Sequence, residues 1–593
     1  MADTDAPTRE TTTPAMTVFK GMAVAPGIAI GPAYRLNHDL PTVTEYCLLP
    51  DQVTQELNRF EEAHTRSLTQ LTALQQRVSQ LPGAAGEEAG LLMGAHAAML
   101  QSSRLVDGIE GRIRDGHQNA DAAVRDAIRE IASQFDAMGD SYLAARADDV
   151  REVGARLIRA LAGRRSRGFD HLPEGAILLA DEITPADTAL MDPDRIAGFA
   201  GVMGGAESHT AIMARALGLP AVLGVAEIMR ADISPDSVAI VDGLAGKVIL
   251  DPDAETLDLY TALQRQQAEA RKALALLAPE PAVTRDGLKV RLMGNADFPR
   301  EAQAALQAGA EGLGLVRTEY LYMNRHDLPA EDELFEAARE MVLAMNGRPI
   351  TFRTLDIGGE KQAPAFEGIL QGQINPALGL RGIRLSLAQP EIFTTQIRAL
   401  LRASVYGPIR ILLPMISHID EVRQAKKLIA DQAEQVLTQG QPRPPVGIMI
   451  ETPAAALSAD QLVSEVAFMA IGSNDLTQYT IAIDRGDEHV ADLYDGASAA
   501  VMRLIQFTSI AARKNGIEVS VCGELAGDPR LTPLLLGLGL TNLSMAPPAL
   551  PLVKQSIRSL DYHRASELTE QLMLNPFDSA SLQAALREMR QGL

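Results

Sequence analysis

The sequence predicts a multidomain α/β protein with an all-helical insertion in its N-terminal half and an eight-stranded barrel in its C-terminal half. Three observations lead to this prediction. The chain has 593 residues, more than the roughly 250 to 300 residues at which a single hydrophobic core stops growing. Apolar runs of strand length alternate with helical segments near both ends of the chain. Between them, residues 51–164 show almost only helical periodicity.

The composition is that of an ordinary globular protein, with 46% hydrophobic and 22% charged residues. The net charge of −22 predicts a surface that repels nucleic acid and anionic lipid and attracts a partner with a basic face. The two cysteines, Cys47 and Cys522, are too few for a disulfide framework. The N-terminus does not have the pattern of a secretory signal, and no apolar run approaches 18 residues. We therefore expect a cytoplasmic protein without membrane insertion.

The first half of the chain reads as one α/β domain interrupted by helices. Residues 1–16 are polar and rich in threonine, which predicts a disordered tail. Residues 17–50 contain short apolar runs separated by glycine and proline, and residues 165–253 return to the same pattern. The apolar runs of this second segment are 176–180, 196–202, 221–224, 238–241 and 247–250. We expect both segments to share one α/β domain, with residues 51–164 inserted as a bundle.

The inserted segment is predicted to be helical because its apolar residues recur with a helical period. One seam runs along a long first helix, with His64 and Ser67 as polar interruptions. The apolar members of this seam are Val53, Leu57, Phe60, Leu71, Leu74 and Val78. Further helices are predicted over 88–101, 104–115, 120–138 and 140–163. Antiparallel helices of this length form bundles.

A glycine-rich motif stands out within the second α/β segment, GGAESHTAIMAR at 204–215. Glycines allow a tight turn and a close approach of the backbone to another group. Ala211 to Leu217 read as helix, so His209 lies at or just before a helix N-terminus, where free N–H groups favour an anion. Histidine can act as a covalent nucleophile. The motif is therefore suited to a histidine that accepts a phosphoryl group, while a buried histidine beside an ordinary turn stays open from these residues alone.

The remainder of the chain is predicted to be a helical linker followed by a barrel. Residues 254–278 contain good helix formers and no glycine or proline, and we place the linker at 254–282. Residues 283–593 contain eight apolar strand-like runs, most of them followed by a helical segment, which predicts a TIM barrel. The eight runs are 290–295, 312–317, 350–353, 409–415, 446–451, 466–474, 518–522 and 542–545.

Polar residues collect where these runs end, and in a TIM barrel the carboxyl ends of the strands carry the active site. We expect the following side chains to converge there: Asn295, Arg317, Arg353, Glu451, Asn474, Asp475 and Cys522. Arginines suit a compact anion with carboxylate and phosphate groups, because guanidinium pairs with both through two hydrogen bonds. Two carboxylates, Glu451 and Asp475, are typical of a Mg²⁺ site that is completed by substrate phosphate. A protonated thiol at Cys522 can deliver a proton to a carbanion. Together they predict a site for phosphoenolpyruvate.

The chain resembles Enzyme I of the bacterial phosphotransferase system, the phosphoenolpyruvate-protein phosphotransferases, within the family of phosphoenolpyruvate-utilising enzymes. The resemblance extends from about Phe19 to Leu593. Besides the histidine motif and TPADT (184–188), the segments that carry it are GLVRTEYLYM (314–323), TFRTLDIGGEK (351–361), NPALGLRGIR (375–384), IMIETPAA (448–455), IGSNDLTQYTIAIDRG (471–486) and VCGELAGD (521–528).

The resemblance implies a role for each matching residue. His209 would attack phosphorus, with Thr188 orienting its imidazole, and Cys522 would protonate the enolpyruvate. Glu451 and Asp475 would hold Mg²⁺. The substrate would be bound by Arg317, Arg353, Arg381, Asn474 and Arg485.

The resemblance also implies partners and leaves alternatives. The phosphoryl group would pass from the histidine to the phosphocarrier protein HPr, docked on the helical insertion, and the protein would be a homodimer through its barrel. Pyruvate phosphate dikinase and phosphoenolpyruvate synthase share these domains, but they carry an additional nucleotide domain for which the chain has no room. A nitrogen-related Enzyme I paralogue acting on another HPr-like carrier stays open. A catalytically silent HPr-binding scaffold is disfavoured by the intact set of arginine, carboxylate and cysteine residues.

One position departs from the family, because Glu207 stands just before the Ser208–His209 pair, where Enzyme I generally has a neutral residue. If this carboxylate faces the imidazole, it is expected to raise the histidine pKa, since an opposite charge favours the protonated form. It would also repel a bound phosphoryl group.

Overall fold

The computed structural model describes residues 16–590 apart from short internal segments. Those segments are 37–42, 79–83, 137–140, 164–171, 182, 184–186, 188–190, 193–194, 205–207, 324, 359–362, 371, 374, 485–489 and 491–492. The chain divides into two compact units, Met1–Glu269 and Ala270–Leu593. The tail predicted at 1–16 lies outside the described residues, except for Met16.

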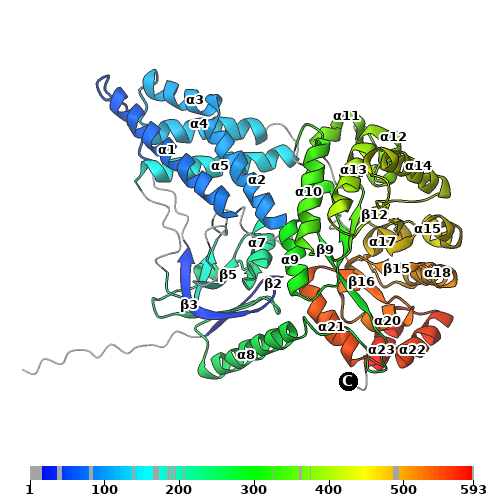
Figure 1. The fold of residues 1–593 in the computed structure, drawn as a ribbon. Coiled ribbons are helices and arrows are strands. Elements are labelled where there is room, and N and C mark those ends of the chain that lie inside the picture. The colour runs from blue at the N-terminus through cyan, green and yellow to red at the C-terminus, as the bar shows by residue number, and fades with distance from the viewer. Residues whose placement is uncertain are drawn as a thin grey trace, which may run out of the picture. The chain divides into compact units, whose positions relative to one another are not determined.

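The N-terminal unit contains an eight-stranded sheet in the order β1-β8-β7-β3-β4-β5-β6-β2 (Figure 1). Its strands are β1 (Thr17–Lys20), β2 (Met22–Ala25), β3 (Ile28–Leu36), β4 (Ala176–Ala180), β5 (Ile196–Gly201), β6 (Ala221–Leu223), β7 (Val238–Asp242) and β8 (Lys247–Leu250). β3 pairs in parallel with β4, although the whole helical segment separates them in the chain. The predicted helical insertion into an α/β fold is therefore confirmed.

The described residues between β3 and β4 form five α-helices. They are α1 (Val53–Val78), α2 (Ala84–Gln101), α3 (Ser103–Arg114), α4 (Ala120–Asp136) and α5 (Ser141–Leu161). Phe60, Leu71 and Leu74 of the predicted seam are buried in a hydrophobic cluster of this bundle. The polar interruptions are accommodated by local bonds, because the Ser67 hydroxyl donates to the Ala63 carbonyl at 2.9 Å and the His64 ring contacts the Leu100 carbonyl at 2.8 Å.

Two further described helices belong to the N-terminal half of the chain. α7 (His209–Leu217) lies between β5 and β6, and α8 (Ala254–Leu276) follows β8 at the place predicted for the linker. None of the α8 residues is buried. This agrees with its sequence, in which apolar residues occur without a sustained apolar face.

The C-terminal unit contains a closed barrel of eight parallel strands, as predicted. The strands are β9 (Arg291–Ala296), β10 (Leu313–Val316), β11 (Ile350–Arg353), β12 (Ile409–Leu413), β13 (Val446–Ile450), β14 (Phe468–Ile471), β15 (Glu518–Val521) and β16 (Asn542–Met545). The barrel closes where β16 pairs with β9 in parallel. Seven of the eight strands are buried along nearly their whole length, which explains why they read as continuous apolar runs.

Helices surround the strands (Figure 1). They are α9 (Pro299–Gln307), α10 (Glu331–Ala344), α11 (Glu367–Leu370), α12 (Ile383–Ala388), α13 (Pro390–Ala403), α14 (Ile419–Val436), α15 (Pro453–Leu457), α16 (Ala459–Leu462), α17 (Ser473–Ile481), α18 (Ala499–Asn515), α19 (Glu524–Gly527), α20 (Thr532–Gly537), α21 (Leu550–Ser559), α22 (Tyr562–Leu574) and α23 (Ser579–Arg590). Their inner faces form one large hydrophobic cluster with the strands.

Two strands end two or more residues before their apolar runs, for physical reasons that the runs do not reveal. The run at 466–474 includes Gly472, the N-cap of α17, and the first two residues of that helix. The run at 409–415 includes a proline that cannot donate to the ladder and Met415, whose φ is +57°.

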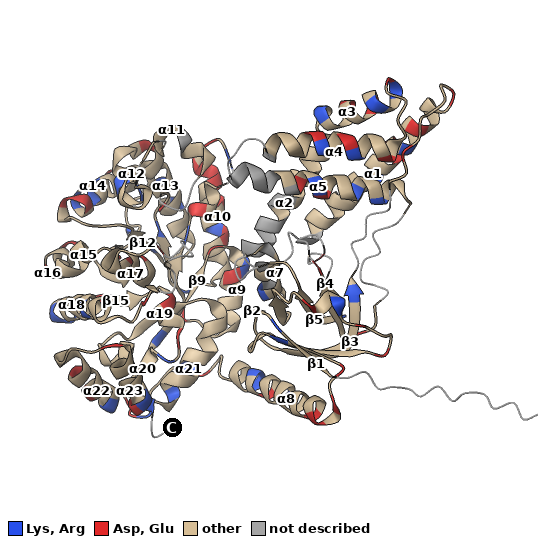
Figure 2. Cartoon of the chain, turned by 180° about the vertical axis from the view of Figure 1, so that it is seen from behind, with Lys and Arg blue, Asp and Glu red and all other residues tan. Residues whose placement is uncertain are grey.

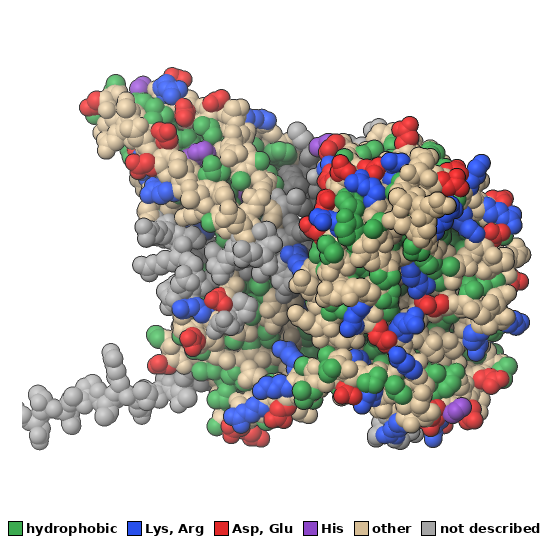
Figure 3. All heavy atoms as spheres, viewed as in Figure 1, with side chains coloured by type: hydrophobic (Ala, Val, Ile, Leu, Met, Phe, Trp, Pro, Cys, Tyr) green, Lys and Arg blue, Asp and Glu red, His purple; other side chains and the backbone are tan. Residues whose placement is uncertain are grey.

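Charged side chains of both signs lie along outer helices such as α14 and α22 (Figure 2). In the space-filling view, acidic and basic side chains are interspersed on the visible face of the C-terminal unit (Figure 3). Within the described part of the chain, no helix is both long and apolar enough to cross a membrane.

Candidate active site

The backbone around the predicted nucleophile has the expected form. α7 begins at His209, and the Ser208 hydroxyl caps it by accepting the Ala211 N–H at 3.3 Å. Gly204 has a φ of +107°, and a Cβ there would lie 2.9 Å from a methyl group of Leu223, so this turn needs glycine. The Thr210 hydroxyl donates to the Ile183 carbonyl at 2.6 Å, which fixes the start of α7 against the segment after β4.

Four sequence predictions concern parts of the chain outside the described residues. Thr188, Glu207 and Arg485 lie in segments that the structure does not describe, and of His209 only the backbone position is described. The roles expected for these side chains stay predictions.

At the barrel, the polar residues expected at the strand ends converge. The Asn295 amide donates to the Cys522 carbonyl at 3.1 Å, and Asn295 Oδ1 accepts the Ser544 hydroxyl at 2.6 Å. These bonds connect residues of β9, β16 and the end of β15. Gly523, which follows β15, allows a close approach to Ser473, which follows the neighbouring strand β14. A Cβ at position 523 would lie 1.8 Å from the Ser473 hydroxyl.

Two of the predicted arginines, Arg353 and Arg381, are held by one buried carboxylate. Asp356 Oδ2 lies 3.2 Å from Arg353 Nη1 and 3.1 Å from Arg381 Nη2, and the Asp356 side chain is 0% exposed. Glu319 completes the arrangement, since its Oε1 accepts Arg353 Nη2 at 2.9 Å and the Asp356 backbone N–H at 3.1 Å. We call these two carboxylates and two guanidinium groups the arginine brace.

The brace keeps both arginines charged in a buried place. Burial opposes the charge of Arg353, but Glu319 and Asp356 outweigh it and hold its pKa well above the usual value. Burial likewise opposes the charge of Arg381, whose pKa is raised by Asp356 and Asp475. Removal of one partner from a buried ion pair typically lowers the free energy of unfolding by about 3 to 5 kcal/mol. The arginines are therefore fixed in position as well as in charge.

The two carboxylates predicted to hold a metal lie beside the brace. Glu451 is completely buried, and its Oε1 accepts the Met415 N–H at 2.5 Å while its Oε2 has no hydrogen-bond partner among the described residues. Asp475 Oδ1 lies 3.5 Å from Arg381 Nη1, also without a hydrogen bond in the described part. Burial, together with Asp356 and Asp475, raises the pKa of Glu451 to about 8.

This pattern fits a divalent cation. Four carboxylates face only two guanidinium groups in the brace and its neighbours Glu451 and Asp475, so two negative charges are unbalanced when all are ionised. Buried carboxylate oxygens without partners are costly unless a cation approaches them. The described residues contain no group of three or more metal-ligating side chains. Mg²⁺ is commonly held by one or two protein carboxylates, with water and phosphate in its other positions.

Asn474 is oriented by a residue that sequence reasoning missed. Its Nδ2 donates to Glu524 Oε1 at 2.9 Å, and its Oδ1 accepts the Glu524 N–H at 3.0 Å. The reciprocal pair fixes which end of the amide is the donor. It also connects the start of α17 to the start of α19, two residues after Cys522.

Cys522 is buried among apolar side chains at the bottom of this polar region. It is 4% exposed and clusters with Leu315, Leu412 and Met449. Its Sγ lies 3.5 Å from the Ile471 carbonyl, to which the thiol donates. Burial and the nearby Glu451 raise its pKa to about 12, so the thiol is protonated at neutral pH. This agrees with the protonated thiol expected from the sequence, and the role of Cys522 as an acid stays a prediction.

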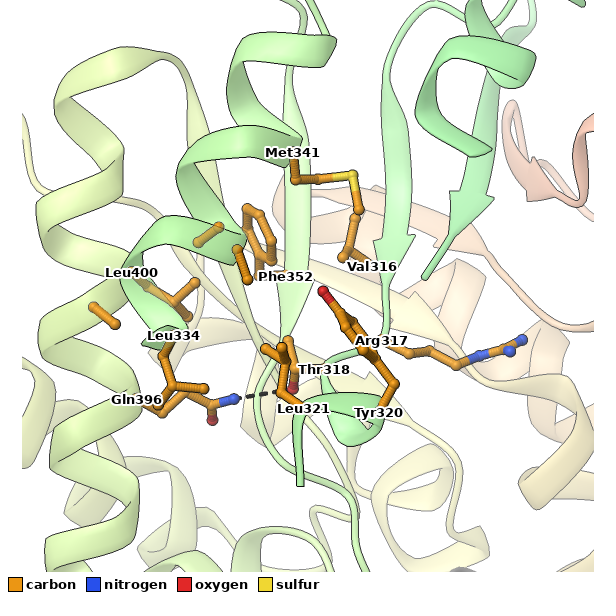
Figure 4. A pocket seen from close by; sticks show the side chains of 13 residues that line it. Val316, Arg317, Thr318, Tyr320, Leu321, Leu334, Met341, Phe352, Gln396 and Leu400 are labelled. Carbon is orange, nitrogen blue, oxygen red and sulfur yellow. Dashed lines mark hydrogen bonds between the residues drawn. The ribbon is translucent and has the colours of Figure 1, made fainter. Parts of the chain in front are cut away.

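Arg317 differs from Arg353 and Arg381 because it is half exposed. Its Nη1 lies 3.2 Å from Asp297, and 47% of its side chain is accessible. Behind it, between α10 and α13, lies a cavity of about 20 Å³ lined mainly by apolar residues. Arg317 points away from this cavity, whereas Thr318 is bonded to Gln396 beside it (Figure 4). The Thr318 hydroxyl also donates to the Arg353 carbonyl at 3.0 Å, which ties the ends of β10 and β11 together.

Profiles of three parts of one enzyme family match the chain. They are described as "PEP-utilising enzyme, N-terminal" over residues 20–146, "PEP-utilising enzyme, mobile domain" over 172–246 and "PEP-utilising enzyme, PEP-binding domain" over 271–562. The middle profile contains the His209 motif, and the last contains the arginine brace.

Complete relatives match over nearly the whole chain. A phosphoenolpyruvate-protein phosphotransferase of Cupriavidus necator is 42% identical over 96% of this chain and 98% of its own length. One from Bacillus subtilis is 37% identical over 94% and 97%. A solution structure of Enzyme I (nEIt) is 33% identical and covers 42% of this chain and 99% of its own, with a TM-score of 0.38. The chain therefore belongs to the phosphoenolpyruvate-protein phosphotransferases of the PEP-utilising enzyme family.

Proposed function

We propose that the protein transfers the phosphoryl group of phosphoenolpyruvate to His209 and from there to a histidine of the phosphocarrier HPr, with release of pyruvate. The observation that carries this proposal is the buried pair of braced arginines beside two carboxylates, Glu451 and Asp475, each of which has one oxygen without a hydrogen bond among the described residues. A compact anion with a carboxylate and a phosphate matches the arginines, and a divalent cation matches the carboxylates.

The proposed chemistry assigns one task to each residue. The imidazole of His209 attacks phosphorus, and the bond between phosphorus and the enol oxygen breaks. The thiol proton of Cys522 then moves to the terminal carbon of the enolate, which gives pyruvate and a thiolate that regains a proton from water. Arg317, Arg353, Arg381, Asn474 and Arg485 bind and orient the substrate, and Thr188 orients the imidazole. Phosphoryl transfer depends mainly on such positioning and on charge stabilisation.

Glu451 and Asp475 would hold Mg²⁺, which would neutralise charge on the transferring phosphoryl group. The support is the unbonded Glu451 Oε2 and Asp475 Oδ1 and the surplus negative charge around them. Because neither oxygen is satisfied by the brace, replacement of Glu451 by glutamine is expected to raise the Mg²⁺ concentration needed for labelling.

The function is tested by incubating the protein with labelled phosphoenolpyruvate, Mg²⁺ and candidate HPr proteins. Label should appear on the enzyme and then on the carrier. The same experiment separates the sugar branch of the phosphotransferase system from the alternative, a nitrogen-related Enzyme I, because the preferred carrier identifies the branch. Pyruvate formation without label on any protein would contradict the proposal.

We further propose a cytoplasmic homodimer formed through the barrel. Apolar side chains of adjacent barrel helices are exposed, among them Leu457 of α15 at 62% and Phe507 of α18 at 48%. Their burial against a second copy would remove this apolar surface from water. Sedimentation velocity of the full chain measures the assembly, and a monomer at micromolar concentration would exclude the dimer.

A fragment of residues 1–253 is expected to accept phosphate from phosphorylated HPr but not from phosphoenolpyruvate. It contains every strand of the N-terminal sheet and His209, whereas the arginine brace belongs to the other unit. Full-length enzyme serves as the control in both directions of transfer. Phosphorylation of the fragment by phosphoenolpyruvate would refute this division of labour between the units.

Replacement of Asp356 by asparagine is expected to lower kcat/KM for phosphoenolpyruvate by about 10- to 100-fold, or about 1.4 to 2.7 kcal/mol. The reason is that both braced arginines lose the carboxylate that fixes them. Asp332→Asn is a matched control, because Asp332 also pairs with an arginine of the same barrel but is 85% exposed, where ion pairs contribute little. Equal kinetics of the two variants would show that the brace does not position the substrate.

A further inference from the structure

A second cavity lies at the opposite end of the barrel from the arginine brace. Its volume is about 470 Å³. Three of its residues, Lys289, Glu311 and Arg348, come shortly before β9, β10 and β11, respectively, and therefore lie at the amino ends of these strands. The connecting segment 278–282, which follows α8, forms another wall. None of these residues has a part in the proposed reaction.

A buried cation forms part of the cavity wall. Lys554 of α21 is 3% exposed, and its ammonium group donates to the Ala278 carbonyl at 2.7 Å and to the Gly309 carbonyl at 3.5 Å. Gly309 makes room for it, because a Cβ there would lie 2.6 Å from Lys554 Nζ and 2.0 Å from the Ala278 oxygen. Burial lowers the lysine pKa, and the nearby Glu311 and Glu280 carboxylates do not fully offset this effect.

A second cation, Arg348, contacts the backbone beside Gly309. The Arg348 guanidinium donates to the carbonyl of Ala310, next to the carbonyl that Lys554 contacts. Among the described residues, neither Lys554 nor Arg348 forms an ion pair with a carboxylate. The two acidic residues of the wall are already engaged, since Glu311 pairs with Lys289 at 3.6 Å and Glu280 pairs with Arg558 at 3.7 Å.

The rest of the wall is mainly apolar, with Gln307 as a neutral polar residue. Its apolar residues are Ala278, Pro279, Pro281, Ala282, Leu292 and Leu306. A concave site with apolar walls and a few convergent polar groups is the usual form of a small-molecule site. In the part of the chain that the structure describes, Lys554 and Arg348 form no ion pair with a carboxylate, although the chain as a whole has a net charge of −22. Two such cations attract a ligand with an anionic group.

We propose that this cavity binds a small organic anion, whose carboxylate or phosphate group lies between Lys554 and Arg348 and whose apolar part rests on the proline and leucine side chains. The ligand would contact both the barrel and the segment that leaves α8, so it would be an effector of this connection rather than a substrate. The site is independent of the function proposed above.

The test measures binding of two probes to the full chain by isothermal titration calorimetry, with glycerol phosphate representing phosphate esters and malate representing carboxylates. Arg348→Gln is expected to weaken binding roughly tenfold or more. The matched control is Arg443→Gln, which removes the same charge from an exposed arginine of the same unit. Arg353→Ala, which disables the arginine brace, is expected to retain the binding. The tighter of the two probes identifies the anionic group.

Three results would overturn the proposal. One is equal affinity of the parent and Arg348→Gln for both probes. Another is loss of binding in Arg353→Ala alone, which would place the anion at the strand ends. The third is no binding of either probe at millimolar concentration. Arg348 is exposed, so its replacement by glutamine is expected to leave the fold intact, and circular dichroism melting checks the folding of each variant.

Discussion

Replacement of His209 by alanine is expected to abolish the acid-labile phosphoryl label that the protein acquires from phosphoenolpyruvate and Mg²⁺. The backbone places this residue first in α7, behind a serine cap, where N–H groups and the helix dipole stabilise an anion. Alanine preserves the helix but removes the nucleophilic nitrogen, so the loss should be complete rather than partial. The measurement is the labelled fraction after acid and after alkaline treatment, since phosphohistidine survives only the second.

The control for this experiment is His563→Ala, because His563 lies on the barrel and its side chain is 83% exposed. This variant should be labelled like the parent. Transfer to HPr should be lost together with labelling in His209→Ala, because the carrier receives its phosphate from the same nitrogen. Label that persists in His209→Ala would mean that another residue is the acceptor.

The fold was predictable from the sequence because its elements are locally encoded. The barrel strands are short and buried on both faces, so they appear as apolar runs between helical segments. The helical insertion is equally visible as 3.6-residue periodicity. The ends of the elements were less predictable, since they depend on single events such as the proline before Met415 or the cap at Gly472.

The site was predictable in part. Arg353, Glu451 and Cys522 were predicted because each stands at the end of a strand-like run, and the structure brings their side chains together. Several partners of the site residues were missed because they belong to distant parts of the chain. Glu319 is 34 residues from Arg353, and Glu524 is 50 residues from Asn474. Tyr479, whose hydroxyl contacts Arg381 at 3.0 Å, is 98 residues away.

A signal for some partners was nevertheless present. Glu319 and Asp356 stand within three residues of Arg317 and Arg353, respectively, and buried arginines require carboxylates. The excess of carboxylates over arginines around Glu451 and Asp475 could not be derived in this way. It requires knowing which carboxylates form ion pairs with the arginines. Glu207 remains a prediction, since it lies outside the described residues.

Replacement of Cys522 by alanine is expected to lower the rate of pyruvate formation by about 10² to 10⁴, the usual contribution of a general acid. Binding of phosphoenolpyruvate should change little, because the thiol donates to the Ile471 carbonyl and forms no bond with the arginine brace. The experiment compares kcat with the dissociation constant of phosphoenolpyruvate. Cys47→Ala is the matched control, because Cys47 is the other cysteine of the chain and is exposed. Normal turnover in Cys522→Ala would remove the thiol from the mechanism.

The pH dependence distinguishes a buried acid from an ordinary thiol. With a pKa of about 12, Cys522 stays protonated as the pH rises from 7 to 10, so loss of this proton should not slow the parent enzyme in that range. A thiol with an ordinary pKa of roughly 8.5 would instead lose about tenfold in rate for each pH unit above that value. The measurement is kcat for pyruvate formation between pH 7 and 10, at saturating Mg²⁺ and phosphoenolpyruvate. A decline of the parent that begins near pH 8.5 and is absent in Cys522→Ala would show that the thiol is exposed to solvent during catalysis. A parent profile without that decline, together with a uniformly slow variant, is the result expected of an acid that burial keeps protonated.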